Sequence, residues 1–212
     1  MHHSSSYASQ QKASYIIARF FWRFTCAIDD EPIPWLRRMD RRIFQYLLLA
    51  PDGRATRDTL QSVFWPDQDA KVSQLSLRSA CSNIRKAIGM LVGTDESENY
   101  FATTDDTISV NLERTSVDVR RYIAHIRSGN TCYATNDVKT AYIHFTRALA
   151  IYRGHIGWGD EQELWLEPLA NECAELQRTA IEHLAQISRE NGAVLSALEY
   201  DAMLSAQGSS MP

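Results

Sequence analysis

The segment spanning residues 64–89 constrains the fold of this chain more than any other part of the sequence. A short helix is predicted to stop at Trp65 and Pro66, and an acidic turn then leads into a longer helix over about residues 71–88. Apolar residues recur in that helix at the spacing of one buried stripe. They are Leu77, Ala80, Cys81, Ile84 and Ile88. With Gly89 as the predicted helix end, the segment indicates two consecutive helices joined by a turn.

The face of the later helix opposite this stripe carries hydrogen-bonding side chains and no acidic residue. Its members are Gln74, Arg78, Ser79, Ser82, Asn83 and Lys86. A carboxylate on such a face would meet the phosphates that line a DNA groove, so an acid-free face favours DNA contact. Arg78 and Asn83 are the better candidates for base edges, because Arg can pair bidentately with guanine and Asn with adenine.

Further basic residues are predicted to contact phosphates. Arg85 and Lys86 lie near the end of the later helix, and the rest lie on an earlier one: Arg37, Arg38, Arg41 and Arg42. The alternative stays open that these arginines are solvated or paired with carboxylates, as exposed arginines usually are. Under that alternative Arg85 in particular has a structural role.

Shorter patterns precede this helix pair. Residues 19–35 are aromatic and β-branched with an acidic turn, which predicts a β-hairpin. Residues 36–50 show helical spacing, and Pro51-Asp-Gly53 is predicted to end that helix. Thr56 supplies an N-cap for the short helix that follows.

A second hairpin is predicted after the helices, from residues 100–103 and 107–112 on either side of Asp105-Asp106. The order of hairpin, three helices and hairpin predicts an α+β winged helix-turn-helix at the N-terminus, with the third helix entering the major groove. The acidic pair at the hairpin tip argues against deep insertion of this wing into DNA.

Charge is divided unevenly along the chain. The total is −4, yet residues 36–89 hold ten basic and five acidic residues, a net of +5. Residues 115–212 hold eight basic and twelve acidic residues, a net of −4, so only the first region should attract a polyanion. Residues 1–114 together hold fourteen basic and fourteen acidic residues, so their net charge is zero. This keeps a second interpretation open, in which the chain is a protein-interaction scaffold whose degenerate winged helix does not bind DNA.

Four blocks in the N-terminal half carry a resemblance to a known family. They are Leu47-Leu-Leu-Ala-Pro-Asp-Gly53, Arg57-Asp-Thr-Leu60, Phe64-Trp-Pro-Asp67 and Leu77-Arg-Ser-Ala-Cys-Ser-Asn-Ile-Arg-Lys-Ala-Ile-Gly89. Through these blocks residues 19–112 resemble the winged-helix domain of the Streptomyces antibiotic regulatory protein family. The resemblance implies a transcriptional regulator that binds direct repeats near promoters and recruits RNA polymerase.

The second half extends the resemblance. Residues 116–122 and 141–154 resemble the bacterial transcriptional activation domain that follows such heads, with tetratricopeptide-like helix packing. A long helical pattern from Trp165 to Ile187 breaks at Asn191-Gly192 and is followed by a shorter helix over residues 193–206. The family's domain normally continues further, so we expect exposed apolar surface or a protein contact, as in a homodimer, at the last helix. The residues concerned are Leu195, Leu198, Met203 and Leu204.

These patterns predict a flexible tail over residues 1–15, a DNA-binding domain over 16–114 and a shortened helical domain over 115–207. No signal peptide or apolar run of about 20 residues is present, which favours a cytoplasmic protein without a membrane partner. The cysteines are predicted to be reduced thiols that hold no metal. They are Cys26, Cys81, Cys132 and Cys173.

Enzymatic function finds little support. Residues 154–159 lack the spacing of a dinucleotide-binding loop, and no catalytic triad follows from the spacings. His155 with Asp160 and Glu161 is explained equally well by a turn between helices. We therefore expect no enzyme activity and no cofactor.

Overall fold

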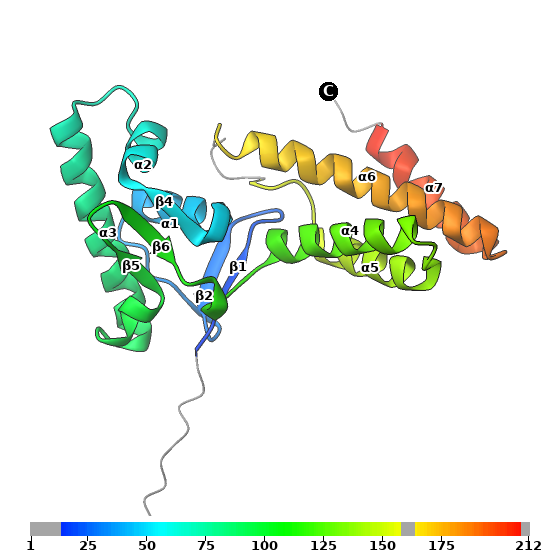
Figure 1. Ribbon diagram of the computed structural model, residues 1–212, viewed down its shortest axis with the longest axis horizontal. Helices are drawn as coiled ribbons and strands as arrows, with labels where there is room; N and C mark the ends of the chain where they lie inside the picture. The colour runs from blue at the N-terminus through cyan, green and yellow to red at the C-terminus, as the bar shows by residue number, and fades with distance from the viewer. Residues whose placement is uncertain (1–13, 158–163, 209–212) are drawn as a thin grey trace, which may run out of the picture. The chain divides into compact units, whose positions relative to one another are not determined.

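A computed structural model describes residues 14–157 and 164–208 (Figure 1). The predicted coarse order is confirmed, because a region of small sheets and helices precedes a helical region. Contacts divide the chain into two compact units. Unit 1 combines the residues up to Ile17 with Ala27–Thr115, and unit 2 combines Ala18–Cys26 with the residues from Ser116 onward. The sequence had placed residues 16–114 in one domain, whereas contacts group Ala18–Cys26 with the helices of unit 2.

The first strands form a four-stranded sheet in the order β3-β2-β1-β7. Its strands are β1 (Ile16–Arg19), β2 (Thr25–Ile28), β3 (Glu31–Pro32) and β7 (Thr115–Val117). β2 and β3 pair antiparallel, with Ile28 opposite Glu31. Asp29 and Asp30 form their turn at φ 47° and 72°, a left-handed conformation that Asp tolerates in hairpins. This is the hairpin predicted over residues 19–35, confined to residues 25–32.

Unit 1 contains three helices and a second sheet. The helices are α1 (Arg38–Leu49), α2 (Arg57–Phe64) and α3 (Ala70–Val92). The sheet has the order β4-β6-β5, and its strands are β4 (Arg54–Thr56), β5 (Phe101–Thr103) and β6 (Thr107–Val110). Short 3-10 turns connect these elements at Pro51–Gly53, Glu96–Asn99 and Leu112–Arg114. β5 and β6 form the predicted second hairpin, whereas β1, β4 and β7 were not predicted.

Two residues determine the conformation of the connection between α1 and α2. Gly53 has φ 67°, and a Cβ atom there would lie 2.6 Å from the carbonyl oxygen of Val110, so only glycine fits. Thr56 caps α2 as predicted, because its side chain accepts a hydrogen bond of 3.1 Å from the backbone N–H of Thr59. Both residues therefore fix where α2 begins.

The predicted end of α3 was wrong. The helix passes through Gly89 and ends at Val92, and Gly93 follows at φ 94°. A Cβ atom on Gly89 would lie 3.4 Å from the Cα atom of Thr94, which is an ordinary contact, so the helix continues through Gly89 without strain. Gly93 takes the C-terminal position instead, where positive φ is favourable for glycine.

Unit 2 contains two consecutive helix pairs. Its helices are α4 (Asp118–Ala134), α5 (Val138–Ile151), α6 (Glu167–Glu190) and α7 (Val194–Gly208). α4 packs on α5 and α6 packs on α7, each across a short connection (Figure 1). A Cβ atom at Gly129 would lie 2.6 Å from the Phe145 ring, so glycine allows the close approach of α4 and α5.

The segment Ala18–Cys26 completes the core of unit 2. The Asp118 carboxylate accepts hydrogen bonds from the backbone N–H of Phe20 at 2.9 and 3.0 Å, and from that of Phe21 at 3.2 Å. Burial raises the pKa of Asp118, and these N–H donors lower it. The Phe21 ring contacts the rings of Tyr122 and Tyr152 at centroid distances of 5.2 and 4.8 Å.

Candidate nucleic-acid interface

Helix α3 presents an acid-free surface in unit 1. Its 23 residues include four basic residues and no Asp or Glu. The basic residues are Lys71, Arg78, Arg85 and Lys86. The predicted apolar stripe is buried, together with Ser73 and Ala87. The opposite side therefore carries the exposed basic residues of the helix.

Four of the predicted site residues form a ridge on this face. Gln74, Arg78, Ser82 and Lys86 are all exposed, and they follow one another at the spacing that places helical side chains in a row. Ser79, which lies beside this row, is half-buried. We call these four residues the α3 ridge. Its side chains offer hydrogen-bond donors, and two of them carry permanent positive charge at neutral pH.

Asn83 is engaged within unit 1. It is half-buried and lies near the carboxylate of Asp40 on α1, which is 1% exposed. Burial raises the pKa of Asp40, while the Asn83 side chain and the backbone N–H and charge of Arg37 lower it. Asn83 is therefore placed to support a buried acid, a role that the helix pattern alone did not reveal.

Arg85 is engaged as well. It is half-buried, and its Nη2 atom donates a hydrogen bond of 2.8 Å to Oγ1 of Thr103 on β5. This contact joins α3 to the β5–β6 hairpin. Arg85 is thereby engaged within unit 1, and its contact with phosphate stays a prediction.

The basic residues of α1 fall into two groups. Arg37 and Arg38 are exposed at the start of the helix, where Arg37 is the N-cap residue. Arg41 and Arg42 are half-buried, and the Arg42 guanidinium lies 5.5 Å from the centroid of the Phe64 ring on α2. Arg42 therefore packs against α2 through a cation–π contact.

Hydrogen bonds hold α3 between α2 and the hairpin. Oγ of Ser73 donates to Oε1 of Gln61 on α2 at 2.9 Å. The Arg57 side chain donates twice to the carbonyl oxygen of Thr104, at 3.1 and 2.8 Å, which ties α2 to the hairpin turn. Asp105 and Asp106 are exposed at that turn, where they would repel phosphate.

Sequence reasoning missed the apolar and N-terminal parts of this face. Leu75 is 65% exposed and Val72 is 50% exposed, and Lys71 is exposed in the first turn of α3. An apolar side chain beside the α3 ridge can contact the methyl group of thymine. The available signal was that Leu75 stands two residues before Leu77 and so falls off the buried stripe.

Within residues 14–157 and 164–208 no three His, Cys, Asp or Glu side chains gather where they could hold a metal ion. In the same part of the chain no helix is long and apolar enough to span a membrane. The four cysteines are free thiols. Asp160 and Glu161, considered with His155 above, lie outside the described residues.

Comparisons with known proteins bear on both regions. Residues 117–207 match the family model of the bacterial transcriptional activator domain. No curated protein sequence matches the chain. The structure is similar to that of Mycobacterium tuberculosis EmbR in complex with a low affinity phosphopeptide, with a TM-score of 0.71 and 20% identity over 89% of this chain and 51% of that one. This chain thus spans about half the length of that protein, and the likeness shows a shared fold.

Proposed function

We propose that this chain is a sequence-specific DNA-binding transcriptional regulator whose N-terminal region is a winged helix. The observation that carries the proposal is the acid-free α3, with its ridge of Gln74, Arg78, Ser82 and Lys86 exposed. A long helix with such a face fits the major groove, which is lined by phosphates and presents base edges to hydrogen-bonding side chains. The fold shared with EmbR and the match of residues 117–207 support the same class of function.

The ridge residues divide by chemistry. Arg78 would read guanine and Gln74 adenine, because these side chains can make paired hydrogen bonds to those bases. Lys86 and Lys71 would bind phosphates, with Arg37 and Arg38 on α1 as further phosphate contacts. Ser79 and Ser82 would add single hydrogen bonds, whereas Asn83 and Arg85 would position the helix.

Unit 2 would serve regulation rather than DNA contact. Its match to a bacterial transcriptional activator domain supports an activator that dimerises or contacts RNA polymerase through its helices. The net negative charge of residues 115–212 agrees with a protein partner for this region. Such a regulator would act in the cytoplasm, where bacterial promoters lie, without catalysis or a cofactor.

The test measures the affinity of the chain for DNA fragments from upstream of its own gene at several salt concentrations. We expect affinity to fall steeply as salt rises. Lys86→Ala should weaken binding to all sequences about equally and reduce the salt slope by about 1, whereas Arg78→Ala should cost about 1–3 kcal/mol and relax base preference. Arg127→Ala, at an exposed position on α4, is the matched control and should bind as the unchanged chain does.

Two results would overturn the proposal. One is a double variant, Arg78→Ala with Lys86→Ala, that binds every fragment as well as the unchanged chain. The other is an absence of salt-dependent binding, which would favour the degenerate winged helix that serves as a protein-interaction scaffold.

A further inference from the structure

Charge in unit 2 is divided between its two helix pairs. α4 and α5 together hold five basic residues and one acidic residue, Asp118. α6 and α7 together hold two basic and seven acidic residues. The carboxylate of Asp118 already accepts hydrogen bonds from the backbone N–H groups of Phe20 and Phe21. The first helix pair therefore carries positive charge that the second pair lacks, and it is the pair that attracts an anion.

Four basic side chains lie together across α4 and α5. His125 on α4 and His144 on α5 are half-buried, with their Nδ1 atoms 3.1 Å apart and their ring centroids 5.4 Å apart. Arg121 precedes His125 by one helical turn, and Arg147 follows His144 by one turn. Because α4 and α5 pack antiparallel across a short connection (Figure 1), both arginines lie on the same side of the histidine pair. We call these four residues the α4–α5 cluster.

The arginines of the cluster have no counter-ion within the described part of the chain. Arg121 and Arg147 are exposed, and neither forms an ion pair with any described residue. Both lie near the histidine pair. Burial lowers the pKa of His125, and so do the positive charges of His144, Arg147 and Arg121. No carboxylate offsets these charges at His125, so the cluster is a concentration of uncompensated positive charge.

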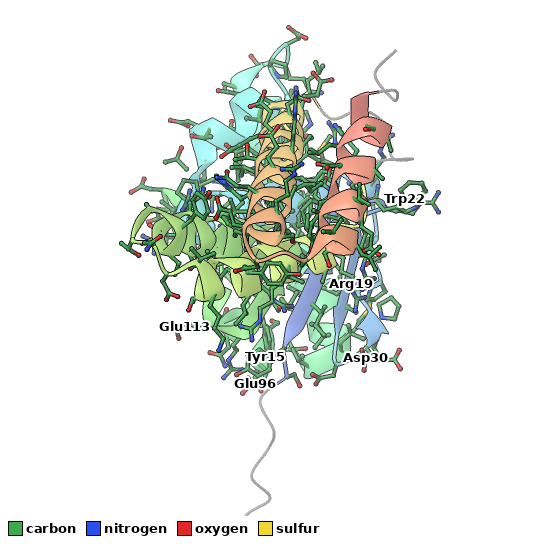
Figure 2. All side chains as sticks on the ribbon, turned by 90° about the vertical axis from the view of Figure 1, so that its right-hand side faces the viewer. Tyr15, Arg19, Trp22, Asp30, Glu96 and Glu113 are labelled. Atoms are coloured by element: carbon green, nitrogen blue, oxygen red, sulfur yellow. The ribbon has the colours of Figure 1, made fainter. Side chains whose placement is uncertain are left out.

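The charged and titratable groups on the elements packed against this helix pair act elsewhere. Glu182 of α6 raises the pKa of His183 on the same helix, which burial lowers. Arg19 of β1, labelled in Figure 2, lies near Asp118 and lowers its pKa. The hydroxyl of Tyr200 on α7 lies 3.2 Å from that of a tyrosine on α5. None of these groups is among those that shift the pKa of the histidine in the cluster.

The histidine contact can take up one more proton. At 3.1 Å one Nδ1 atom donates a hydrogen bond and the other accepts it, so at least one of the two rings is neutral. A dianion bound by the two arginines would offset their positive charge and favour a second proton on the pair, taken from solvent. All four side chains would then be able to donate charge-assisted hydrogen bonds, which are stronger than those between neutral groups.

We propose that the α4–α5 cluster binds a compact dianionic oxyanion, such as the terminal phosphate group of a small molecule. Arg121 and Arg147 bind its oxygens through their guanidinium groups, and the protonated histidine pair donates further hydrogen bonds to it. A long polyanion is disfavoured, because the acidic α6 and α7 of the same unit would repel it. The site does not rest on the proposed DNA binding by α3, and the two are measured in separate assays.

The test follows the histidine ring signals of the full chain by NMR while inorganic sulfate is added at constant ionic strength. Sulfate is a dianion throughout the histidine range, so its own charge does not change with pH. We expect sulfate to raise the pKa of His125, and its affinity to increase at least about 3-fold from about pH 7.5 to about pH 6. Arg121→Ala with Arg147→Ala should weaken binding at least about 10-fold, because two charge-assisted contacts are lost.

Two phosphate esters identify the kind of ligand. Methyl phosphate is a monoester that carries a dianionic phosphate group, and it should bind about as tightly as sulfate at about pH 7.5. Dimethyl phosphate is a monoanionic diester like the links of a nucleic-acid backbone, and it should bind at least about 5-fold more weakly.

A matched variant separates the cluster from general charge. Arg127→Ala with Lys139→Ala removes two other exposed basic residues from the same two helices and should keep sulfate affinity. Both double variants should keep the thermal unfolding midpoint, because the replaced residues are exposed. The proposal is overturned if the two double variants bind sulfate equally well, if affinity does not increase as pH falls, or if dimethyl phosphate binds as tightly as methyl phosphate. It is also overturned if Zn²⁺ binds the histidine pair and sulfate does not.

Discussion

Helices α3 and α7 each bury one side against their own unit and expose opposite kinds of chemistry on the other. α3 exposes the α3 ridge, which holds two basic residues, and the helix as a whole contains no acidic residue. α7 packs on α6 and exposes large apolar side chains. Their exposed fractions are 64% for Val194, 79% for Leu195, 58% for Leu198 and 49% for Met203.

This difference indicates which kind of binding partner each helix suits. The basic face of α3 is stabilised by binding a polyanion and little by contact with an apolar surface. The apolar face of α7 is stabilised when a partner covers it and removes it from water. Exposed apolar side chains gathered on one helix are typical of a protein contact, so the α7 surface is suited to one. The exposed apolar surface expected for the last helix is confirmed at three of its four residues, and Leu204 is half-buried.

The largest expected effect concerns the buried side of α3. Leu77 is fully buried, so Leu77→Ala should lower the free energy of unfolding by about 3 kcal/mol. Arg78→Ala, the neighbouring change on the exposed side, should alter it by less than about 0.5 kcal/mol. Urea unfolding followed by circular dichroism measures both. Equal losses for the two variants would contradict the assignment of the two faces.

A smaller effect is expected where the two faces of α3 meet. Asn83→Ala removes the amide beside the buried carboxylate of Asp40 and should lower the free energy of unfolding by about 1–2 kcal/mol, because that buried acid loses a polar neighbour. Ser82→Ala, at the exposed neighbour, is the control and should be nearly neutral. If Asn83→Ala instead keeps full stability and changes base preference in DNA binding, Asn83 belongs to the reading face.

On α7 the expected change lies in surface chemistry rather than in stability. The unchanged chain should bind an apolar dye such as anilinonaphthalene sulfonate, or associate in solution. Leu195→Gln with Leu198→Gln should remove that behaviour and change the free energy of unfolding by less than about 0.5 kcal/mol. Dye fluorescence and sedimentation velocity measure the two properties. If the unchanged chain is a monodisperse monomer and binds no dye, α7 does not form an apolar contact surface.

The smallest expected effect is a difference between the two units in how their stability depends on pH. Burial lowers the pKa of His125, and so do the nearby His144, Arg147 and Arg121; burial also lowers the pKa of His183. The unfolded chain therefore binds protons more readily, and stability should fall as pH drops through the ordinary histidine range near 6.5. The described part of unit 1 contains no histidine, so only unit 2 should respond.

Thermal unfolding between about pH 5 and 7.5, across the ordinary histidine range, measures this dependence. His125→Gln should flatten it, whereas His155→Gln, at an exposed position, should leave it unchanged. A slope that persists in full after His125→Gln would assign the effect to other groups.

Local signals predicted the helices and the hairpins well. Thr56 capped α2 as expected, and the apolar stripe of α3 was buried as its spacing indicated. The end of α3 was missed because Gly89 and Gly93 carry the same local signal, and only the backbone of the structure distinguishes them, since Gly93 alone has a positive φ. β4 and β7 span three residues each, too few for a pattern to emerge.

Prediction of the candidate site from the sequence was limited in the same way. Periodicity placed Gln74, Arg78, Ser82 and Lys86 on an exposed face, because exposure follows from helix geometry. It could not show that Asn83 reaches Asp40 on another helix or that Arg85 reaches Thr103 on a strand. Such partners are distant in sequence, so they become visible only when the elements have packed.

The hydrogen bonds from Phe20 and Phe21 to Asp118 set an order of events during synthesis. The acceptor lies 98 residues after Phe20, and most of unit 1 lies between them, as an insertion within unit 2. Because a chain emerges N-terminal end first, Ala27–Thr115 can fold while Ala18–Cys26 still lacks its partner. Translation that stops just short of Asp118 would leave three phenylalanines without their core, and such a fragment should be prone to aggregation.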